Sequence, residues 1–245
     1  MTGNILAVVV GLAVGSLLNL IIIRLSQDEP FWTWRICCPH CLQTMPRLGF
    51  TFPWSSAWGG GRCSFCGEPL FSRFPVVEAA SGALALALWW RFPGSALLWL
   101  YGPFTAALLV LTVLDLRYFW LPDVITFPGI ALGLSGGLIL PHIGLWNALL
   151  GASLGWAFFR GVRWAYEKVT EGRRQGVGAG DAKLMAFIGA VLGVKALPFV
   201  LMSSATLGSL AGVFAMLKKG RHRFTFIPYG PFLALGALLF FFLRK

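Results

Sequence analysis

Long apolar stretches without charge alternate along this chain with short basic segments. Hydrophobic residues make up 57% of the 245 residues and charged residues only 12%, whereas a soluble domain carries about 25% charged residues. A soluble core of this size does not need such segregation. Helices that cross about 30 Å of hydrocarbon do need it, since each requires roughly 20 mainly apolar residues. The pattern therefore predicts an all-α, polytopic membrane bundle.

About eight stretches are apolar enough to be transmembrane helices. Their approximate bounds are 4–24, 76–91, 96–116, 124–140, 144–160, 182–195, 197–217 and 226–243. The sixth is short and rich in glycine. The first is longer than the core of a signal peptide and has no basic segment before it, so we expect it to be a retained helix.

The positions of Lys and Arg predict the orientation of these helices. Of the 20 Lys and Arg residues, 16 fall in loops that eight spans place on one side, namely 24–75, 115–123, 160–183 and 218–225. Basic residues are retained on the cytoplasmic side, so we expect these loops in the cytosol and both termini outside. Topology and contact with anionic lipid explain the net charge of +11, and we expect membrane lipid, not nucleic acid, as a partner.

All five cysteines lie in the segment 26–75, the one connection with room for a folded unit. Cys38 and Cys41 form one C-x-x-C pair, and Cys63 and Cys66 form another after 21 intervening residues. Four thiolates from two such pairs complete a closed, tetrahedral zinc site. A unit of about 50 residues is near the size at which a metal is needed for stability.

The chain is therefore predicted to have three parts. They are a first transmembrane helix (1–25), a small cytoplasmic zinc-binding domain (26–75) and a transmembrane catalytic core (76–245). The zinc should be structural, because four protein ligands leave no open coordination position. Two disulfides are the alternative, but they require an oxidising compartment. Cys37 is left over, as a small buried residue or as a ligand exchanging with Cys38.

Two aspartates occupy positions where acids are rare. Asp115 lies near the end of the third predicted helix, and Asp181 begins the sixth after the glycine-rich segment 176–180. An aspartate within a membrane helix is costly and is a candidate functional residue by default. Because the third helix runs toward the cytosol and the sixth away from it, both carboxylates should lie at the same, cytosolic, membrane level.

Two carboxylates at one level predict the chemistry of an aspartic protease. When they are close they cannot both ionise cheaply, so one retains a proton. The ionised Asp115 or Asp181 then takes a proton from the attacking water, and the protonated partner assists the carbonyl oxygen and the leaving amine. Gly178 and Gly180 are expected to let the backbone approach closely and to adopt positive φ before the helix, so that an extended peptide could lie beside Asp181.

Simpler interpretations of the acids stay open. Asp181 can be only the N-cap of the sixth helix, and Asp123 is expected to be the N-cap of the fourth. Glu78 is expected to pair with Arg73, which would anchor the segment 26–75 to the bundle. A phosphate-binding loop before Asp181 is disfavoured, because G-x-G-x-x-G is absent and an acid at the helix start repels phosphate.

With these residues in place, the sequence resembles the type 4 prepilin peptidases, the leader peptidases of type II secretion and competence systems. Gly178-Ala179-Gly180-Asp181 matches the GxGD signature shared with presenilin-like intramembrane aspartyl proteases. Further similar pieces follow the family order over nearly the whole chain. They are Gly15-Ser16-Leu17-Leu18-Asn19 with Arg24, the two cysteine pairs, Ser72-Arg73-Phe74-Pro75-Val76-Val77-Glu78, Asp115 with Leu121-Pro122-Asp123, Asp181-Ala182-Lys183-Leu184, and Ile227-Pro228-Tyr229-Gly230-Pro231.

The resemblance implies an enzyme of the bacterial inner membrane with its active site and zinc domain facing the cytosol. Its substrates would be prepilins or pseudopilins, whose short basic leader is cut before a hydrophobic helix. The implied site residues are these: catalytic Asp115 and Asp181, a supporting loop with Gly178, Gly180 and Lys183, and zinc ligands Cys38, Cys41, Cys63 and Cys66. Many members also methylate the new N-terminus with S-adenosylmethionine, for which the sequence shows no glycine-rich nucleotide loop.

Two other classes of function compete with the protease hypothesis. A transporter would use Asp115 and Asp181 to relay protons or bind a cation, and would be expected to place its acids nearer the middle of helices. A non-catalytic assembly scaffold would bind partners through the zinc domain, and its aspartates would be dispensable.

Overall fold

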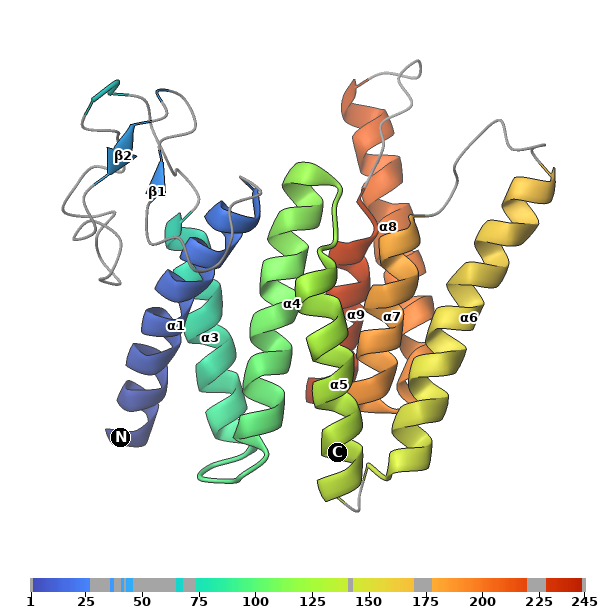
Figure 1. Cartoon of the computed structure of the whole chain (residues 1–245), viewed down its shortest axis with the longest axis horizontal. Helices are drawn as coiled ribbons and strands as arrows, with labels where there is room; N and C mark the ends of the chain where they lie inside the picture. The colour runs from blue at the N-terminus through green and yellow to red at the C-terminus, as the bar shows by residue number, and fades with distance from the viewer. Residues whose placement is uncertain are drawn as a thin grey trace. The chain divides into compact units, whose positions relative to one another are not determined.

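The computed structural model describes residues 2–26, 36–37, 41, 43–45, 65–67, 74–140, 143–169, 178–219 and 228–243. The secondary structure of these residues is helical apart from two short strands (Figure 1). The elements are α1 (Thr2–Ser26), β1 (Ile36–Cys37), β2 (Thr44–Met45), α3 (Phe74–Arg91), α4 (Leu98–Tyr118), α5 (Asp123–Ile139), α6 (Leu145–Val169), α7 (Ala179–Leu192), α8 (Ala196–Lys219) and α9 (Gly230–Leu243). Contacts divide the chain into two compact units, Met1–Val110 and Leu111–Lys245.

Each of the eight predicted stretches coincides with one helix, so the all-helical prediction is confirmed. Within the described residues, three helices are long and apolar enough to cross a membrane by length and composition, namely α1, α4 and the part of α8 from Ala196 to Leu217. The shorter α5 and α9 are apolar as well. The protein is thus a helical membrane protein, and the count of eight spans stays a prediction.

Helix α6 is longer than the sequence pattern predicts. The predicted span ended at 160, but the helix continues to Val169. Its last turns are amphipathic and carry an ion pair one turn apart, between Arg163 Nε and Glu167 Oε1 at 2.7 Å. Such i,i+4 pairs and a polar face stabilise a helix in water. A prediction from hydropathy alone assigns such a polar segment to a loop.

In the first unit, α1 packs against α3 through small residues. A Cβ on Gly15 would lie 2.7 Å from the Cα of Glu78, so the two backbones approach as closely as glycine allows. The buried Glu78 carboxylate accepts a hydrogen bond from Ser16 Oγ at 2.9 Å and also bonds with the Asn19 side chain. The predicted partner Arg73 lies outside the described residues, so that pairing stays untested.

The two strands form an antiparallel pair in the segment between α1 and α3. Ile36 lies opposite Met45 and Cys37 opposite Thr44. Cys41 lies between the two strands, and the leftover Cys37 contributes its backbone to β1.

In the second unit, α7 is the most buried helix. Eleven of its 14 residues are buried, and it packs between α5 and α6 (Figure 1). Glycines make this possible on both sides: a Cβ on Gly133 of α5 would lie 2.7 Å from the backbone of Ala190, and Gly151 of α6 lies directly against Gly189. Small residues that bring backbones together are typical of helix packing in membranes.

The contact between Gly151 and Gly189 gives a prediction about stability. Gly151→Ala places a methyl group against the Gly189 carbonyl, so α6 and α7 must separate, at a cost of about 1–3 kcal/mol for overpacking. We expect a lower melting temperature in detergent and less monodisperse protein. Gly161→Ala is the matched control on the same helix, because a Cβ there meets nothing within 4 Å. Equal melting of the two variants would contradict the proposed packing.

Candidate active site

Asp115 lies near the end of α4 and is only 6% exposed. Its Oδ2 accepts a hydrogen bond from the backbone N–H of Gly230, the first residue of α9, at 2.9 Å. The first N–H groups of a helix have no partner within the helix and attract negative charge. A Cβ on Gly230 would lie 2.6 Å from the same oxygen. Only glycine therefore fits at this position without displacing the carboxylate.

Asp181 lies in the first turn of α7 and is 8% exposed. The N-cap of α7 is Gly178, so the interpretation of Asp181 as a simple N-cap is wrong. Asp181 is the third helical residue, and its carboxylate accepts a hydrogen bond from the Gly178 backbone. This is the reach of an acidic side chain back to the N-cap that helices commonly use.

Of the two properties predicted for the glycines before Asp181, positive φ is wrong and close approach is found at Gly180. Gly178 has φ −64°, and Gly180 is helical and is not among the glycines with positive φ. Neither forms a left-handed turn, and Gly180 and Lys183 are the second and fifth residues of α7 and do not belong to a loop. Gly180 is needed for close packing instead, since a Cβ there would lie 2.9 Å from Cδ1 of Leu121.

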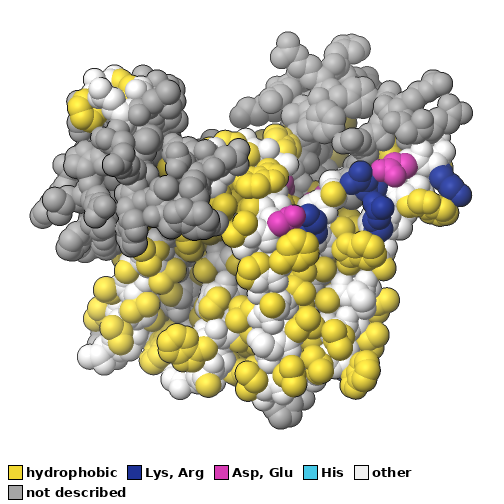
Figure 2. Space-filling view, viewed as in Figure 1, with side chains coloured by type: hydrophobic (Ala, Val, Ile, Leu, Met, Phe, Trp, Pro, Cys, Tyr) yellow, Lys and Arg dark blue, Asp and Glu magenta, His cyan; other side chains and the backbone are white. Residues whose placement is uncertain are grey.

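The fold brings Asp115 and Asp181 together. Although they are far apart in the sequence, their carboxyl groups are close enough to repel each other electrostatically. Helices in this unit alternate in direction, so the end of α4 and the start of α7 share one end of the bundle. Figure 2 shows the charged side chains of this unit gathered toward one end, with apolar side chains over the rest of the visible face.

An ion pair lies beside the two aspartates. Lys183 Nζ contacts Asp123 Oδ1 and lies 5.6 Å from the centre of the Phe127 ring. The N-cap of α5 is Pro122, so the prediction that Asp123 is the N-cap is wrong. No side chain forms a capping hydrogen bond at this helix start. Lys183 instead links the first turn of α7 to the first turn of α5, a role that only the pairing of these two helices reveals.

Sequence reasoning also missed a hydrogen bond just before α9. Tyr229 Oη and Ser204 Oγ are 2.7 Å apart, and the Ser204 side chain is fully buried. Tyr229 immediately precedes Gly230, the donor to Asp115. The similarity of the segment 227–231 to the family's pattern could have drawn attention to Tyr229, but the composition of this segment does not indicate which atoms it contacts.

The predicted zinc ligands are only partly within reach of the structure. Cys41 is half-buried and Cys66 exposed, while Cys38 and Cys63 lie outside the described residues. Among the residues that the structure describes, no group of three or more His, Cys, Asp or Glu side chains is placed to hold a metal. With half of the donor set outside this description, the zinc prediction stays untested.

Fold and site together define a class: a helical membrane protein with two buried carboxylates, from distant helices, paired at one end of a bundle. Comparison with known proteins gives the family. Residues 102–213 match the type IV leader peptidase family, and residues 9–92 match the bacterial peptidase A24 N-terminal domain. The chain belongs to the type IV leader peptidase family.

Relatives cover most of this chain. It is 32% identical to a prepilin leader peptidase/N-methyltransferase of Aeromonas hydrophila, over 92% of this chain and 85% of the relative. A protein of the same name from Burkholderia pseudomallei (strain 1026b) is 35% identical, over 96% and 84% of the respective lengths. One from Pseudomonas putida is 32% identical, over 94% and 87%. No solved structure matches the chain.

The ion pair gives a prediction about the first turn of α7. Lys183→Glu places two negative charges together, so we expect a lower melting temperature than that of the parent protein. The loss should be about 1 kcal/mol or less, because Asp123 is half exposed. The exchanged double variant Asp123→Lys with Lys183→Glu should recover the melting temperature. If it melts no higher than Lys183→Glu alone, the pair does not stabilise the contact.

Proposed function

We propose that this chain is an aspartic endopeptidase that removes the short basic leader of type 4 prepilins or type II secretion pseudopilins. The observation that carries the proposal is the pairing of Asp115 and Asp181, two buried carboxylates from separate helices. The relatives' name, prepilin leader peptidase/N-methyltransferase, supplies the substrate class.

The reaction needs one proton shared by the two carboxylates. Because like charges held close do not both ionise cheaply, one group is protonated and its partner ionised. The ionised group takes a proton from water as the oxygen attacks the scissile carbonyl. The protonated group donates a hydrogen bond to the carbonyl oxygen, and a proton passes to the leaving amine as the C–N bond breaks.

Backbone N–H groups hold the pair in position. Gly230 donates to Oδ2 of Asp115, and Gly178 bonds the carboxylate of Asp181. Each leaves the second oxygen of its carboxylate available for water, substrate or the shared proton. Asp115 and Asp181 can exchange the two roles, because among the described residues neither forms an ion pair that would fix it as the ionised member.

We further propose that the chain crosses the bacterial inner membrane eight times, with the aspartates at the cytosolic face. The retention of 16 of the 20 Lys and Arg residues on one side supports this orientation. A leader rich in basic residues would then stay in the cytosol while the bond after it reaches the aspartates.

Methylation of the new N-terminus is part of the proposal through the relatives' name. S-adenosylmethionine would supply the methyl group. The described residues contain no glycine-rich turn after a strand that would hold a nucleotide. Prepilin incubated with and without S-adenosylmethionine distinguishes the two activities by the mass of the product's N-terminal peptide.

We propose a structural zinc ion in the segment 26–75. The donor set fits, since Cys38, Cys41, Cys63 and Cys66 offer four thiolates and leave no open coordination position. The antiparallel pairing of β1 with β2 supports it, because Cys41 of the first cysteine pair lies between these strands. A metal held in this way would stabilise the cytoplasmic segment and take no part in hydrolysis.

The aspartate pair is tested by removing one charge at a time. Asp115→Asn and Asp181→Asn keep side-chain shape and an oxygen that accepts a hydrogen bond, but neither amide can take a proton from water. We expect each variant to insert normally and to leave a purified prepilin uncut, as judged by electrophoresis and mass measurement. Asp123→Asn is the matched control and should cleave, because its carboxylate lies outside the pair. Normal cleavage by either dyad variant would reject the mechanism.

The zinc site is tested by metal content. Purified, reduced protein should contain about one zinc ion per chain, and Cys→Ser at any of the four proposed ligands should lower that content and the stability of the segment. Cys37→Ser is the control and should retain the metal. Intact protein without zinc would rule out the site, and loss of metal in the Cys37 variant would reassign a ligand.

A further inference from the structure

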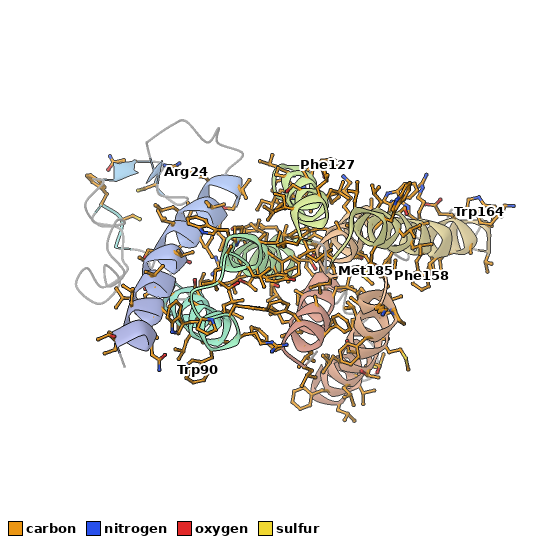
Figure 3. All side chains as sticks on the ribbon, turned by 90° about the horizontal axis from the view of Figure 1, so that it is seen from below. Arg24, Trp90, Phe127, Phe158, Trp164 and Met185 are labelled. Carbon is orange, nitrogen blue, oxygen red and sulfur yellow. The ribbon has the colours of Figure 1, made fainter. Side chains whose placement is uncertain are left out.

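An apolar groove lies between α6 and α8, with Met185 of α7 beneath it. Its volume is about 540 Å³, and its floor includes the fully buried Met185. The groove is open on the α6 side, where Phe158 is half exposed; Figure 3 labels Phe158 and Met185 at neighbouring positions on α6 and α7. Its main lining residues are Leu154, Phe158, Met185, Val194, Leu197 and Leu201.

The groove reaches to within one helical turn of Asp181 on α7. Met185 lies one helical turn after Asp181 on the same side of α7, about 6 Å along the axis. From Asp181 to Leu192, where α7 ends two residues before the lining residue Val194, the helix rises about 16 Å. A chain that meets the aspartates and continues along α7 therefore enters the groove directly.

A tyrosine bridge marks the end of the groove toward the aspartates. The Tyr229 ring packs against Phe159 of α6, with ring centres 6.0 Å apart, and its hydroxyl bonds Ser204 of α8. Phe159 directly follows the lining residue Phe158 on α6, and Ser204 lies three residues after the lining residue Leu201 on α8. The next residue after Tyr229 is Gly230, the donor to Asp115. One short segment thus joins the groove to the catalytic carboxylate.

The size and chemistry of the groove limit its occupant. Its lining contains no charged side chain, so a basic leader has no counter-charge there. A volume of 540 Å³ is that of a pocket for a small molecule or a row of side chains, roughly 300–1,000 Å³. A whole helix about 10 Å wide does not fit inside, but one face of an apolar helix can lie along it.

We propose that this groove binds the apolar helix that follows the scissile bond of the substrate, with the Tyr229 bridge at the junction between groove and active site. The inference rests on the proposed peptidase function and deepens it. The groove binds the mature part of the substrate, and the aspartates cleave the bond that joins this part to the leader. The enzyme then recognises its substrate through one side of the substrate's apolar helix, which lies in a fixed register relative to Asp181.

The first test fills the groove. Ala157 lines it and is exposed, so Ala157→Trp should obstruct the substrate helix without changing the aspartates. For full-length prepilin in detergent we expect KM to rise about tenfold with kcat nearly unchanged, the signature of lost binding. Ser153→Trp, one turn away on the same helix and outside the groove, is the matched control and should retain the parental KM.

The second test keeps the groove intact. A photoreactive amino acid at Leu201, inside the groove, or at the exposed neighbour Met202, outside it, is introduced into the inactive Asp115→Asn protein and mixed with prepilin in lipid vesicles. We expect the Leu201 position to capture the substrate at residues after the cleavage site, and the Met202 position to capture lipid. This result holds even where Ala157→Trp fails to fold.

The outcomes separate the two levels of the proposal. Lipid or a second copy of this chain captured at Leu201, in place of substrate, would overturn the groove assignment, as would a parental KM in folded Ala157→Trp. Both results leave the peptidase function standing if the parent protein cleaves prepilin. A parent that cleaves no prepilin or pseudopilin would instead remove the proposed function on which the groove assignment rests.

Discussion

The backbone contact between α6 and α7 is the constraint on which the second unit depends. Gly151 and Gly189 meet directly, and Gly155 packs against the backbone of Met185 one turn further along. Lipid offers apolar helices little hydrophobic reason to associate, so close van der Waals packing through small residues has to hold them. With α5 packed on its other side, α7 is fixed in depth and rotation. Its first turn, which carries Asp181, is fixed with it.

The packing of these helices buries two carboxylates, and this burial is energetically unfavourable. An acid within a membrane helix is unfavourable unless it faces the protein interior and finds partners. The chain provides those partners from the backbone, with Gly230 at the start of α9 and Gly178 at the start of α7. Helix N-termini carry unpaired N–H groups and partial positive charge. They can therefore stabilise a carboxylate without a permanent cation, which would hold both groups ionised and prevent the sharing of a proton.

The same packing links chemistry to recognition. Helix α7 carries Asp181 at its start and Met185 in the floor of the groove, and the segment before α9 carries both the Tyr229 bridge and the N–H that binds Asp115. Under the proposed function, a substrate helix that settles in the groove would bring its leading bond to the aspartates in a set register. Precise positioning of this kind contributes to rate as well as to affinity.

Sequence alone was enough to predict the helices and to single out the two acids as candidate functional residues. Apolar length is a local property, so every predicted stretch falls on a helix. An acid in an apolar stretch is equally visible without a structure, and Asp115 and Asp181 were predicted in this way. Hydropathy was less informative where a helix leaves the apolar region, as with α6, whose last turns are maintained by polar contacts such as that of Arg163 with Glu167.

Tertiary structure alone decided which groups meet. Gly230 lies 115 residues from Asp115, and Lys183 lies 60 residues from Asp123, so no local pattern reveals either contact. The glycines of the GxGD segment show the same division: their presence indicated a special backbone, but the reason is close packing of Gly180 on Leu121 and not a left-handed turn. A sequence states which side chains are available, whereas the packing of helices against one another determines the atoms they reach.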